Sequence, residues 1–282
     1  MLSYFQAVVI GLLQGVTELF PISSLGHSVL VPAWLGWDDL VNAQSADESF
    51  YLAFVVALHV ATAIALLVHY RADWVRIIGG FARTLRTRRV ESADERLAWL
   101  LVVATIPVGL TGLLLEHSLR TLFAKPLAAA VFLTLNGALL LAGERFRTRA
   151  RRRASTGLDA LDTKEATIVG VAQIGALFAG ISRSGITMIA GLARGLDHED
   201  AARFSFLLAT PVILAAGLYK VPDLLGPLGD GIRGQALAGA VAAGLAATIA
   251  VRFLVRFFET RTLTPFAIYC LAAGAASVLR FA

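Results

Sequence analysis

The sequence has few charged residues and only one cysteine. Of its 282 residues, 16% are charged and 57% are hydrophobic, whereas soluble domains carry about a quarter charged residues. This composition excludes a disordered chain, a coiled coil and an ordinary soluble enzyme. Cys270 has no second cysteine with which to form a disulfide or a thiolate metal cluster, so neither kind of crosslink shapes the fold.

Two common functional motifs are also missing. The sequence contains no HExxH zinc-binding motif and no glycine-rich nucleotide-binding loop, and we expect no organic cofactor. The formal net charge is +5, but the excess arginine is confined to short segments between apolar stretches. Positive charge in such segments is typical of membrane topology, so we expect no nucleic-acid partner.

Six apolar stretches are long enough to cross a membrane. At about 1.5 Å per residue each covers about 25–30 Å, which is close to the hydrocarbon thickness of a bilayer. Two further apolar stretches, 1–35 and 165–196, are interrupted near their middles at 20–24 and 180–185. We predict an all-α integral membrane protein of about ten helices, with six transmembrane spans and two re-entrant helical hairpins. The predicted spans are 50–69, 97–115, 126–143, 203–219, 234–251 and 263–281.

The charges between the spans orient them, because cytoplasmic loops retain lysine and arginine. Segment 71–96 holds seven arginines, and segment 144–164 holds six arginines and Lys164, so both are predicted to be cytoplasmic loops. Segment 36–49 has no basic residue and is predicted to lie outside. Its acidic residues are Asp38, Asp39, Asp47 and Glu48. The first hairpin then enters from outside, the second enters from the cytoplasm, and both termini are outside, as expected of a multi-pass protein of the cell membrane.

A weak internal repeat supports this topology. Sliding the sequence by 159 residues, without a gap, matches several glycine and polar positions. The identical pairs are Gly11 and Gly170, Gln14 and Gln173, Ile22 and Ile181, Ser23 and Ser182, Gly26 and Gly185, Gly36 and Gly195, and Asp38 and Asp197. We predict one membrane domain, 1–282, built from inverted repeats 1–143 and 165–282 and joined by the basic linker 144–164. Such folds place their binding sites where broken helices meet near the membrane interior.

The two interruptions carry the polar groups that are most costly at membrane depth, and these form the candidate site. In the first, Gln14 and Glu18 lie one helical turn apart on one face. The small and polar residues that follow are Ser23, Ser24, Gly26 and His27. The second carries Ser182, Arg183, Ser184, Gly185 and Thr187. Backbone N–H groups, hydroxyls and a guanidinium at the start of a helix predict an anion site, and phosphate fits so many converging donors better than carboxylate.

Each of these residues also has a structural interpretation. Glu18 could simply pair with Arg183, and Arg183 could be a snorkelling positive-inside residue. Ser23 and Ser24 could cap the following half-helix, and one of them could combine both tasks. His27 could be a packing histidine. We favour function for Glu18 and Arg183, because an ionisable residue inside a membrane is usually functional.

The remaining histidines and Gln14 are interpreted more conservatively. Gln14 is expected to support the site by hydrogen bonding. His59, inside the span 50–69, is expected to pack against or bond a hairpin rather than to act in catalysis. His69, His117 and His198 lie at the edges of loops without the spacing of metal ligands.

Both interruptions resemble the signatures of one enzyme family. Residues 14–27, Gln-Gly-Val-Thr-Glu-Leu-Phe-Pro-Ile-Ser-Ser-Leu-Gly-His, and residues 180–187, Gly-Ile-Ser-Arg-Ser-Gly-Ile-Thr, resemble the two motifs of the undecaprenyl-diphosphate phosphatases of the bacitracin-resistance type. Weaker resemblances cover 54–62, 204–211 and 264–269. The resemblance implies a membrane enzyme with two re-entrant regions. Such an enzyme removes the terminal phosphate of the C55 isoprenyl diphosphate on the outer face, recycles the lipid carrier for cell-wall glycans and confers bacitracin resistance.

The resemblance also implies roles for individual residues. It places Glu18, Ser24, His27 and Arg183 in the active site. The residues that would line it and bind substrate are Gln14, Ser23, Gly26, Ser182, Ser184, Gly185 and Thr187. Three positions depart from the family pattern: Gln14 stands where many members have a second Glu, Leu25 where Ser or Thr is usual, and Ala179 where Pro commonly precedes the glycine. The glutamine weakens any scheme in which two carboxylates hold a metal.

These roles lead to a mechanistic hypothesis. Arg183 clamps the diphosphate, and Ser24 or an ordered water attacks. His27 relays a proton, while Glu18 orients His27 or the nucleophile, or helps to hold Mg²⁺ or Ca²⁺. The isoprenyl tail is expected to lie along apolar surface between helices.

Two rival functions and a possible homodimer remain open. A secondary transporter or lipid flippase would share the inverted repeats and the midplane polar site. An acid-phosphatase-type lipid phosphatase would match Leu25-Gly26-His27 superficially, but it needs a further basic motif and a second histidine followed by Asp. Gly239 and Gly244 could form a homodimer interface, although packing within the chain explains them equally well.

Overall fold

Twelve α-helices and no β-strand occur in the part of the chain that the structure describes. The computed structural model describes residues 2–44, 50–123, 125–150, 157–158 and 161–282, without the side chains of 44, 116–123 and 147–150. Asp47, Glu48, Arg151, Arg152 and Arg153 lie outside this description, as do the side chains of His117, Arg147 and Arg149.

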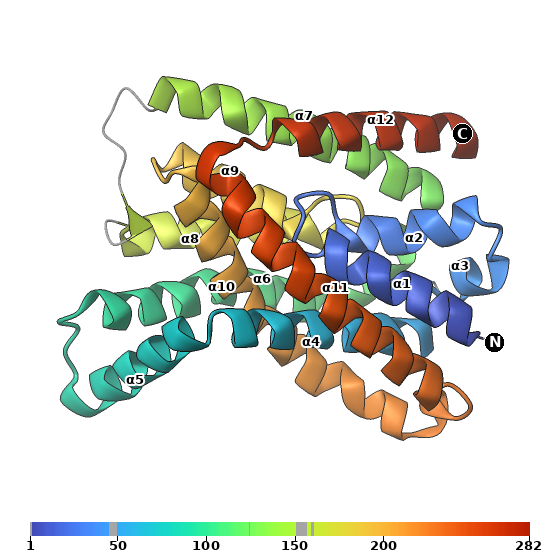
Figure 1. Cartoon of the computed structure of the whole chain (residues 1–282), viewed down its shortest axis with the longest axis horizontal. Helices are drawn as coiled ribbons and strands as arrows, with labels where there is room; N and C mark the ends of the chain where they lie inside the picture. Colours follow the sequence, from blue (N-terminus) through green and yellow to red (C-terminus); the bar gives the residue numbers. More distant parts are fainter. Residues whose placement is uncertain (1, 45–49, 124, 151–156, 159–160) are drawn as a thin grey trace.

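Figure 1 shows the order of the helices along the chain. In chain order they are α1 (Tyr4–Thr17), α2 (Ser24–Trp34), α3 (Asp38–Gln44), α4 (Phe50–His69), α5 (Arg71–Thr87), α6 (Ala93–Phe123), α7 (Pro126–Ala150), α8 (Thr163–Ala172), α9 (Arg183–Ala193), α10 (His198–Lys220), α11 (Arg233–Thr260) and α12 (Thr264–Phe281). Three short 3-10 helices are η2 (Gln173–Leu177), η3 (Val221–Leu225) and η4 (Pro227–Gly229).

Six helical stretches are long and apolar enough to cross a membrane, so the predicted spans are confirmed. They are Phe50–His69, Ala93–Leu115, Pro126–Phe146, His198–Leu225, Arg233–Thr260 and Thr264–Phe281. Large apolar side chains on their outer faces, such as Leu114, Ile249 and Leu279, are 72–86% exposed. Exposure of this kind along several helices is expected of a lipid-facing surface.

The prediction of about ten helices was too low, because α3 and α5 lie in segments that we expected to be loops. In α5, Ile77, Gly80 and Thr84 recur at helical spacing and are buried. Gly80 lies against the backbone of Glu95, and the Trp99 indole donates to Thr84 Oγ1 at 3.0 Å. The many arginines of this segment occupy the other face of an amphipathic helix that packs on α6.

The two interrupted stretches form helical hairpins whose tips meet in the middle of the molecule (Figure 1). Hairpin 1 consists of α1, the turn 18–23 and α2. Hairpin 2 consists of α8, η2, the turn 178–182 and α9. Gly180 N donates to Ser23 Oγ at 3.1 Å. From α7, Asn136 Nδ2 donates to Pro21 O at 3.0 Å, and Asn136 Oδ1 accepts from Ser182 N at 2.9 Å. The polar backbone of both turns is thereby satisfied at membrane depth.

Several matched positions of the two halves have the same structural task. Gly11 lets α1 approach α11, since an added Cβ would lie 2.2 Å from Gly239 O, and Gly170 does the same for α8 and α6. Gly36 and Gly195 both follow their hairpins with positive φ, at 68° and 98°. These correspondences agree with an internal repeat. The boundaries of the repeats and their inverted orientation remain predictions.

The contact between α1 and α11 also explains Gly239. An added Cβ at this position would lie 2.8 Å from Ala7 O of the same chain, and at Gly244 it would lie 3.6 Å from Ala61 O. Gly239 therefore serves packing within the chain, whereas an added Cβ at Gly244 would make only ordinary van der Waals contact. A homodimer remains a prediction without a surface assigned to it.

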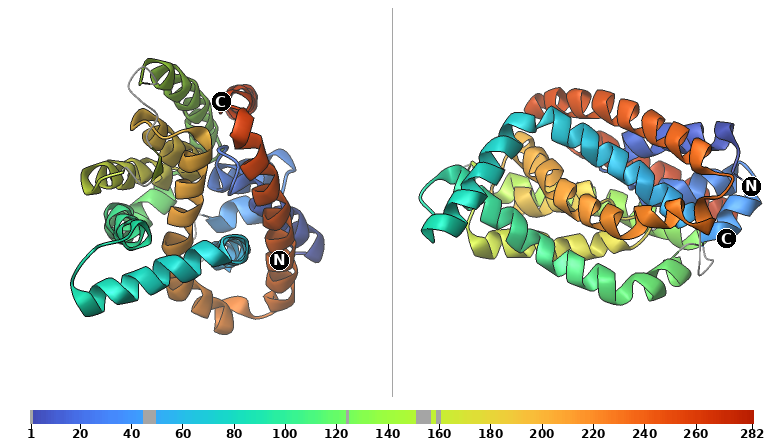
Figure 2. Two further views of the ribbon diagram at one scale, coloured as in Figure 1. Left: turned by 60° about the vertical axis from the view of Figure 1, so that its left-hand side comes forward. Right: turned by 90° about the horizontal axis from the view of Figure 1, so that it is seen from below.

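The two ends of the molecule differ in charge. Figures 1 and 2 place both termini at one end and α5 at the opposite end. The α5 end carries the arginine-rich segment 71–96, whereas the end with the termini carries the acidic start of α3. This separation is the one that the charge pattern predicts.

Candidate active site

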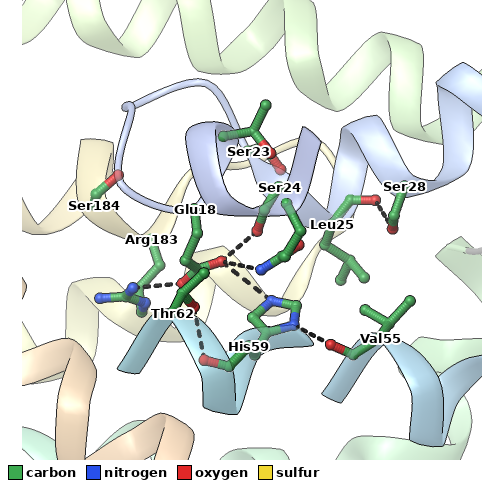
Figure 3. A network of polar contacts seen from close by, with 12 residues as sticks. Glu18, Ser23, Ser24, Leu25, Ser28, Val55, His59, Thr62, Arg183 and Ser184 are labelled. Atoms are coloured by element: carbon green, nitrogen blue, oxygen red, sulfur yellow. Dashed lines mark hydrogen bonds and ion pairs between the residues drawn. The ribbon is translucent and has the colours of Figure 1, made fainter. Parts of the chain in front are cut away.

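Glu18 lies at the centre of a network that joins four helices (Figure 3). Its Oε1 accepts from Arg183 Nη2 at 2.6 Å. Its Oε2 accepts from Ser24 Oγ at 2.5 Å and from Gln14 Nε2 at 3.1 Å, and lies 3.1 Å from His59 Nε2. Hairpin 1, α4 and hairpin 2 thus all reach one carboxylate. The acidic group of hairpin 1 thus contacts the guanidinium of hairpin 2 directly, which is the pairing that the sequence left open as a structural interpretation.

Burial makes these contacts necessary. Glu18 is only 7% exposed, and a buried carboxylate is tolerated only when it is paired and hydrogen-bonded. The guanidinium supplies the opposite charge, while the hydroxyl and the amide supply neutral donors. The resulting carboxylate is held in one orientation, with Oε2 directed at the Ser24 hydroxyl.

Arg183 is the first residue of α9, immediately after the N-cap Ser182. Its guanidinium also donates to Ser205 O at 3.4 Å. Thr187 Oγ1 donates to Arg183 O at 2.7 Å, one turn along the same helix. Arg183 therefore stands at a helix N-terminus, where backbone N–H groups and the helix dipole favour an anion.

The serines of hairpin 2 hold the turn rather than contact Glu18. Ser182 Oγ accepts from Gly185 N at 3.1 Å and lies 3.0 Å from Ser184 Oγ. Ser184 Oγ donates to Phe20 O of hairpin 1 at 3.2 Å. These predicted substrate-binding residues thus lie at the site, but their hydroxyls bond the two turns.

The two serines of hairpin 1 divide the tasks that the sequence left open. Ser23 is the N-cap of α2 and accepts from Gly26 N at 3.2 Å. Ser24 directs its hydroxyl at Glu18. Gly26 permits the close approach of the tips, because a Cβ there would lie 2.8 Å from Gly180 Cα.

His27 is placed differently from the expectation that Glu18 orients it. Its Nδ1 lies 2.7 Å from Ser23 O, and its Nε2 lies 2.7 Å from the hydroxyl of Tyr269 on α12. The two rings also stack, with centroids 5.7 Å apart. Both ring nitrogens are therefore engaged away from Glu18, and the hydrogen bonds of the described residues join His27 to Tyr269 instead.

His59 is the residue whose importance sequence reasoning underestimated. The expectation that it bonds a hairpin is met, but the group that it contacts is Glu18 itself. The available signal was a histidine in the middle of the apolar span Phe50–His69, inside the weakly family-like segment 54–62. A polar side chain at that depth requires a partner, but the sequence does not say which one.

The donor set around Glu18 does not fit a metal ion held by the protein. Both carboxylate oxygens already accept from hydrogen-bond donors. Within the described residues, no group of three or more His, Cys, Asp or Glu side chains could hold a metal. Gln14 supplies an amide where a second carboxylate would be needed. A divalent cation would therefore have to be held mainly by the oxygens of a bound diphosphate.

An apolar cavity of about 470 Å³ begins beside the hairpin tips. Leu25 and Ala179 line its inner part, next in sequence to Ser24 and Gly180. It continues between α4, α6 and α10 to Tyr219 and Lys220, at the end of α10. A cavity of this size and lining suits an apolar ligand of moderate length.

Comparison with known proteins agrees with this geometry. The family described as "Bacitracin resistance protein BacA" matches residues 7–276. Undecaprenyl-diphosphatase 2 of Frankia alni is 57% identical, with 100% of this chain and 98% of that protein covered. Undecaprenyl-diphosphatase of Mycolicibacterium paratuberculosis is 58% identical over 99% and 97% of the two chains, and undecaprenyl-diphosphatase 2 of Chromobacterium violaceum is 46% identical over 97% of each. Because the match includes both hairpins and nearly the whole chain, this protein belongs to the bacitracin resistance protein BacA family.

Proposed function

We propose that the protein hydrolyses undecaprenyl diphosphate to undecaprenyl phosphate and inorganic phosphate. The observation that carries the proposal is the meeting of Glu18, Ser24 and Arg183 at the two hairpin tips. A carboxylate, a hydroxyl and a guanidinium at a helix N-terminus supply a base, a candidate nucleophile and a phosphate clamp. The relatives that cover almost the whole chain carry the name undecaprenyl-diphosphatase.

In this mechanism the diphosphate binds at the start of α9. Arg183 and the backbone N–H groups there contact the phosphoryl oxygens and stabilise the charge that spreads over them in the transition state. The bond from the terminal phosphorus to the bridging oxygen breaks, and undecaprenyl phosphate leaves. Glu18 accepts the proton of the attacking hydroxyl, and one water is consumed overall.

Two nucleophiles fit the site. Ser24 already donates its hydroxyl hydrogen to Glu18, so attack by Oγ would form a phosphoserine that water then hydrolyses. A water could instead attack directly. Gln14 Oε1 is buried and has no hydrogen-bond partner among the described residues, and it could accept from such a water next to Glu18. His27 and Tyr269 are then candidates for carrying protons at the edge of the site.

We propose that the first part of the isoprenyl tail occupies the apolar cavity. The cavity has the volume of a moderate-sized ligand, so the remainder of the C55 chain would stay in the lipid. Tyr219 and Lys220, at its far end, belong to the end of the molecule that carries the termini. From the positive-inside rule we propose that this end is external and that the active site opens to the outer face, where the enzyme recycles the carrier for cell-wall glycans and confers resistance to bacitracin.

The decisive experiment is phosphate release from C55 diphosphate by the purified protein in detergent. We expect release by the wild type and by Glu165→Gln, whose carboxylate pairs with Arg194, the C-cap of α9, but not by Glu18→Gln. Absence of release by the wild type would instead support a transporter or flippase. Parallel reactions with a chelator test the need for Mg²⁺ or Ca²⁺, and expression of the wild type, but not of Glu18→Gln, should raise the bacitracin concentration that cells tolerate.

The sidedness can be tested independently of activity. In a Cys270→Ala background, Asp38→Cys should react with a membrane-impermeant maleimide on intact cells, and Gly79→Cys on α5 should not. Asp38 and Gly79 are exposed at opposite ends of the molecule. The reverse labelling pattern would place the terminal end in the cytoplasm and contradict the proposed orientation.

A further inference from the structure

His59 is the second potential cation at Glu18, and it comes from a transmembrane helix. Its Nε2 lies 3.1 Å from Glu18 Oε2, and its Nδ1 lies 2.8 Å from Val55 O one turn earlier on α4 (Figure 3). Thr62 Oγ1 donates to His59 O at 2.6 Å. No other charged side chain of the described residues forms a hydrogen bond or ion pair with His59. The ring is therefore fixed between its own helix and the carboxylate.

Both ring nitrogens face acceptors. A carbonyl oxygen and a carboxylate oxygen cannot donate, so both contacts are hydrogen bonds only when each nitrogen carries a proton. With both bonds formed, His59 would be an imidazolium, and Glu18, Arg183 and His59 would together carry one net positive charge. A centre of that sign attracts a diphosphate.

The two cations bind different oxygens of Glu18. Arg183 occupies Oε1, whereas His59 shares Oε2 with Ser24 and Gln14. An arginine that clamps phosphate must turn at least some of its N–H groups from the carboxylate towards the substrate. His59 cannot follow, because its ring is bonded to its own helix. It therefore remains on the carboxylate after Arg183 has engaged the diphosphate.

We propose that His59 is a positioning residue that stays paired with Glu18 and thereby releases Arg183 for the substrate. The inference rests on the proposed phosphatase function. His59 keeps Oε2 directed at the Ser24 hydroxyl, and it prevents Glu18 from holding the guanidinium when the diphosphate arrives. His59 acts through Glu18 and does not itself contact the phosphate.

The test compares two substitutions at this position. In His59→Gln the side-chain amide can still donate to Glu18, whereas His59→Met retains bulk without a donor. We expect His59→Met to lower kcat about 100-fold, because misplacing a reacting group by about 1 Å has an effect of that size. KM should change less than about threefold, since His59 does not touch substrate, and His59→Gln should recover kcat to within about tenfold of the wild type.

The matched control is His198, which likewise contacts a glutamate: its Nε2 lies 2.6 Å from Glu144 Oε1. His198→Met should leave the kcat of folded protein unchanged. A His59→Met enzyme with kcat within about threefold of the wild type, or a His59→Gln enzyme as slow as His59→Met, would show a packing role and overturn the proposal. In that case wild-type phosphate release would still stand, so failure of the inference differs from failure of the proposed function.

A second measurement does not depend on turnover. In protein labelled with ¹⁵N-histidine, the ring signal that disappears in His59→Gln should show protons on both nitrogens in the wild type. A ring without a proton on Nε2 would contradict the bond to Glu18 and overturn the inference, whatever the enzyme assay shows.

Discussion

The two hairpins share a scaffold but not their chemistry. At the matched positions 23 and 182, serine caps a half-helix in both, and at 26 and 185 glycine allows the tips to approach. The residues that meet at the site occupy positions where the repeats differ. Glu18 matches Leu177, which lines the apolar cavity, and Ser24 matches Arg183. Identical residues thus build the crossing, and the differing ones supply acid, hydroxyl and guanidinium.

The matched residues Gln14 and Gln173 are identical, but they have different tasks. Gln14 donates to Glu18 at 3.1 Å, whereas Gln173 donates to Ala104 O on α6 at 3.0 Å. One amide therefore belongs to the site and the other to the packing of hairpin 2. The comparison teaches that an identity between the repeats does not by itself assign a task, because the role of a residue depends on what faces it.

The largest loss of activity is expected when Arg183 is replaced, the residue of hairpin 2 that matches Ser24 of hairpin 1. Arg183→Ala should reduce kcat/KM for C55 diphosphate by about 10³-fold, because it removes the clamp on the transferring phosphoryl group. Arg194→Ala, at the other end of α9 and paired with Glu165, is the control and should retain activity. A near-normal rate in Arg183→Ala would refute the clamp.

The matched residue of hairpin 1 gives the next largest effect. We expect Ser24→Ala to lower kcat about 100-fold, since it removes the hydroxyl that Glu18 orients. The neighbouring Ser28→Ala, whose hydroxyl donates to Leu25 O at 2.8 Å, should be nearly as active as the wild type. Turnover by Ser24→Ala within a few-fold of the wild type would eliminate the covalent route and identify water as the nucleophile.

Replacing Gln14 and Gln173 separately compares the tasks of the two hairpins directly. Gln14→Leu should lower kcat about tenfold, because the carboxylate of Glu18 loses a donor. Gln173→Leu should leave kcat intact and reduce the free energy of unfolding by about 0.5–1.5 kcal/mol, the net contribution of one hydrogen bond. Phosphate release and thermal unfolding of both variants measure the two effects. Equal kinetic losses would show that Gln173 also serves the site.

The smallest kinetic effects are expected for the scaffold glycines. Gly11→Ala and Gly170→Ala should each destabilise the protein by about 1–3 kcal/mol, because the new methyl groups meet backbone atoms of α11 and α6. The fraction that remains folded should keep its kcat. Gly79→Ala, with open space around an added Cβ, is the control and should be neutral or slightly stabilising. If only one of the two repeat variants lost stability, the structural equivalence of the crossings would be contradicted.

Much of this arrangement could be predicted from local sequence. The six spans follow from long apolar runs, and both hairpin turns follow from polar residues with Pro21 or glycine inside such runs. The helix α5 was missed because its arginines obscure the spacing of Ile77, Gly80 and Thr84. The positive-inside rule places a basic segment in the cytoplasm, but it does not distinguish a basic loop from a basic amphipathic helix.

The partners of the polar residues were much harder to predict. In one of the alternatives Glu18 orients His27, yet His27 bonds Tyr269, which is 242 positions away in the chain. His59 was expected to support a hairpin, and it lies on the central carboxylate. Both cases depend on which helix faces which, and no local pattern specifies that.

The sequence by itself determined that the chain lies in a membrane, where its spans and broken helices are, and which polar residues enter the apolar interior. Transfer of apolar and polar groups into lipid is a local property of each segment, so composition is sufficient for these conclusions. Only the tertiary structure decided that Glu18 meets Arg183, Ser24, Gln14 and His59 at once. Glu18 and Arg183 are 165 positions apart, and their contact results from how α4 and the two hairpins pack against one another.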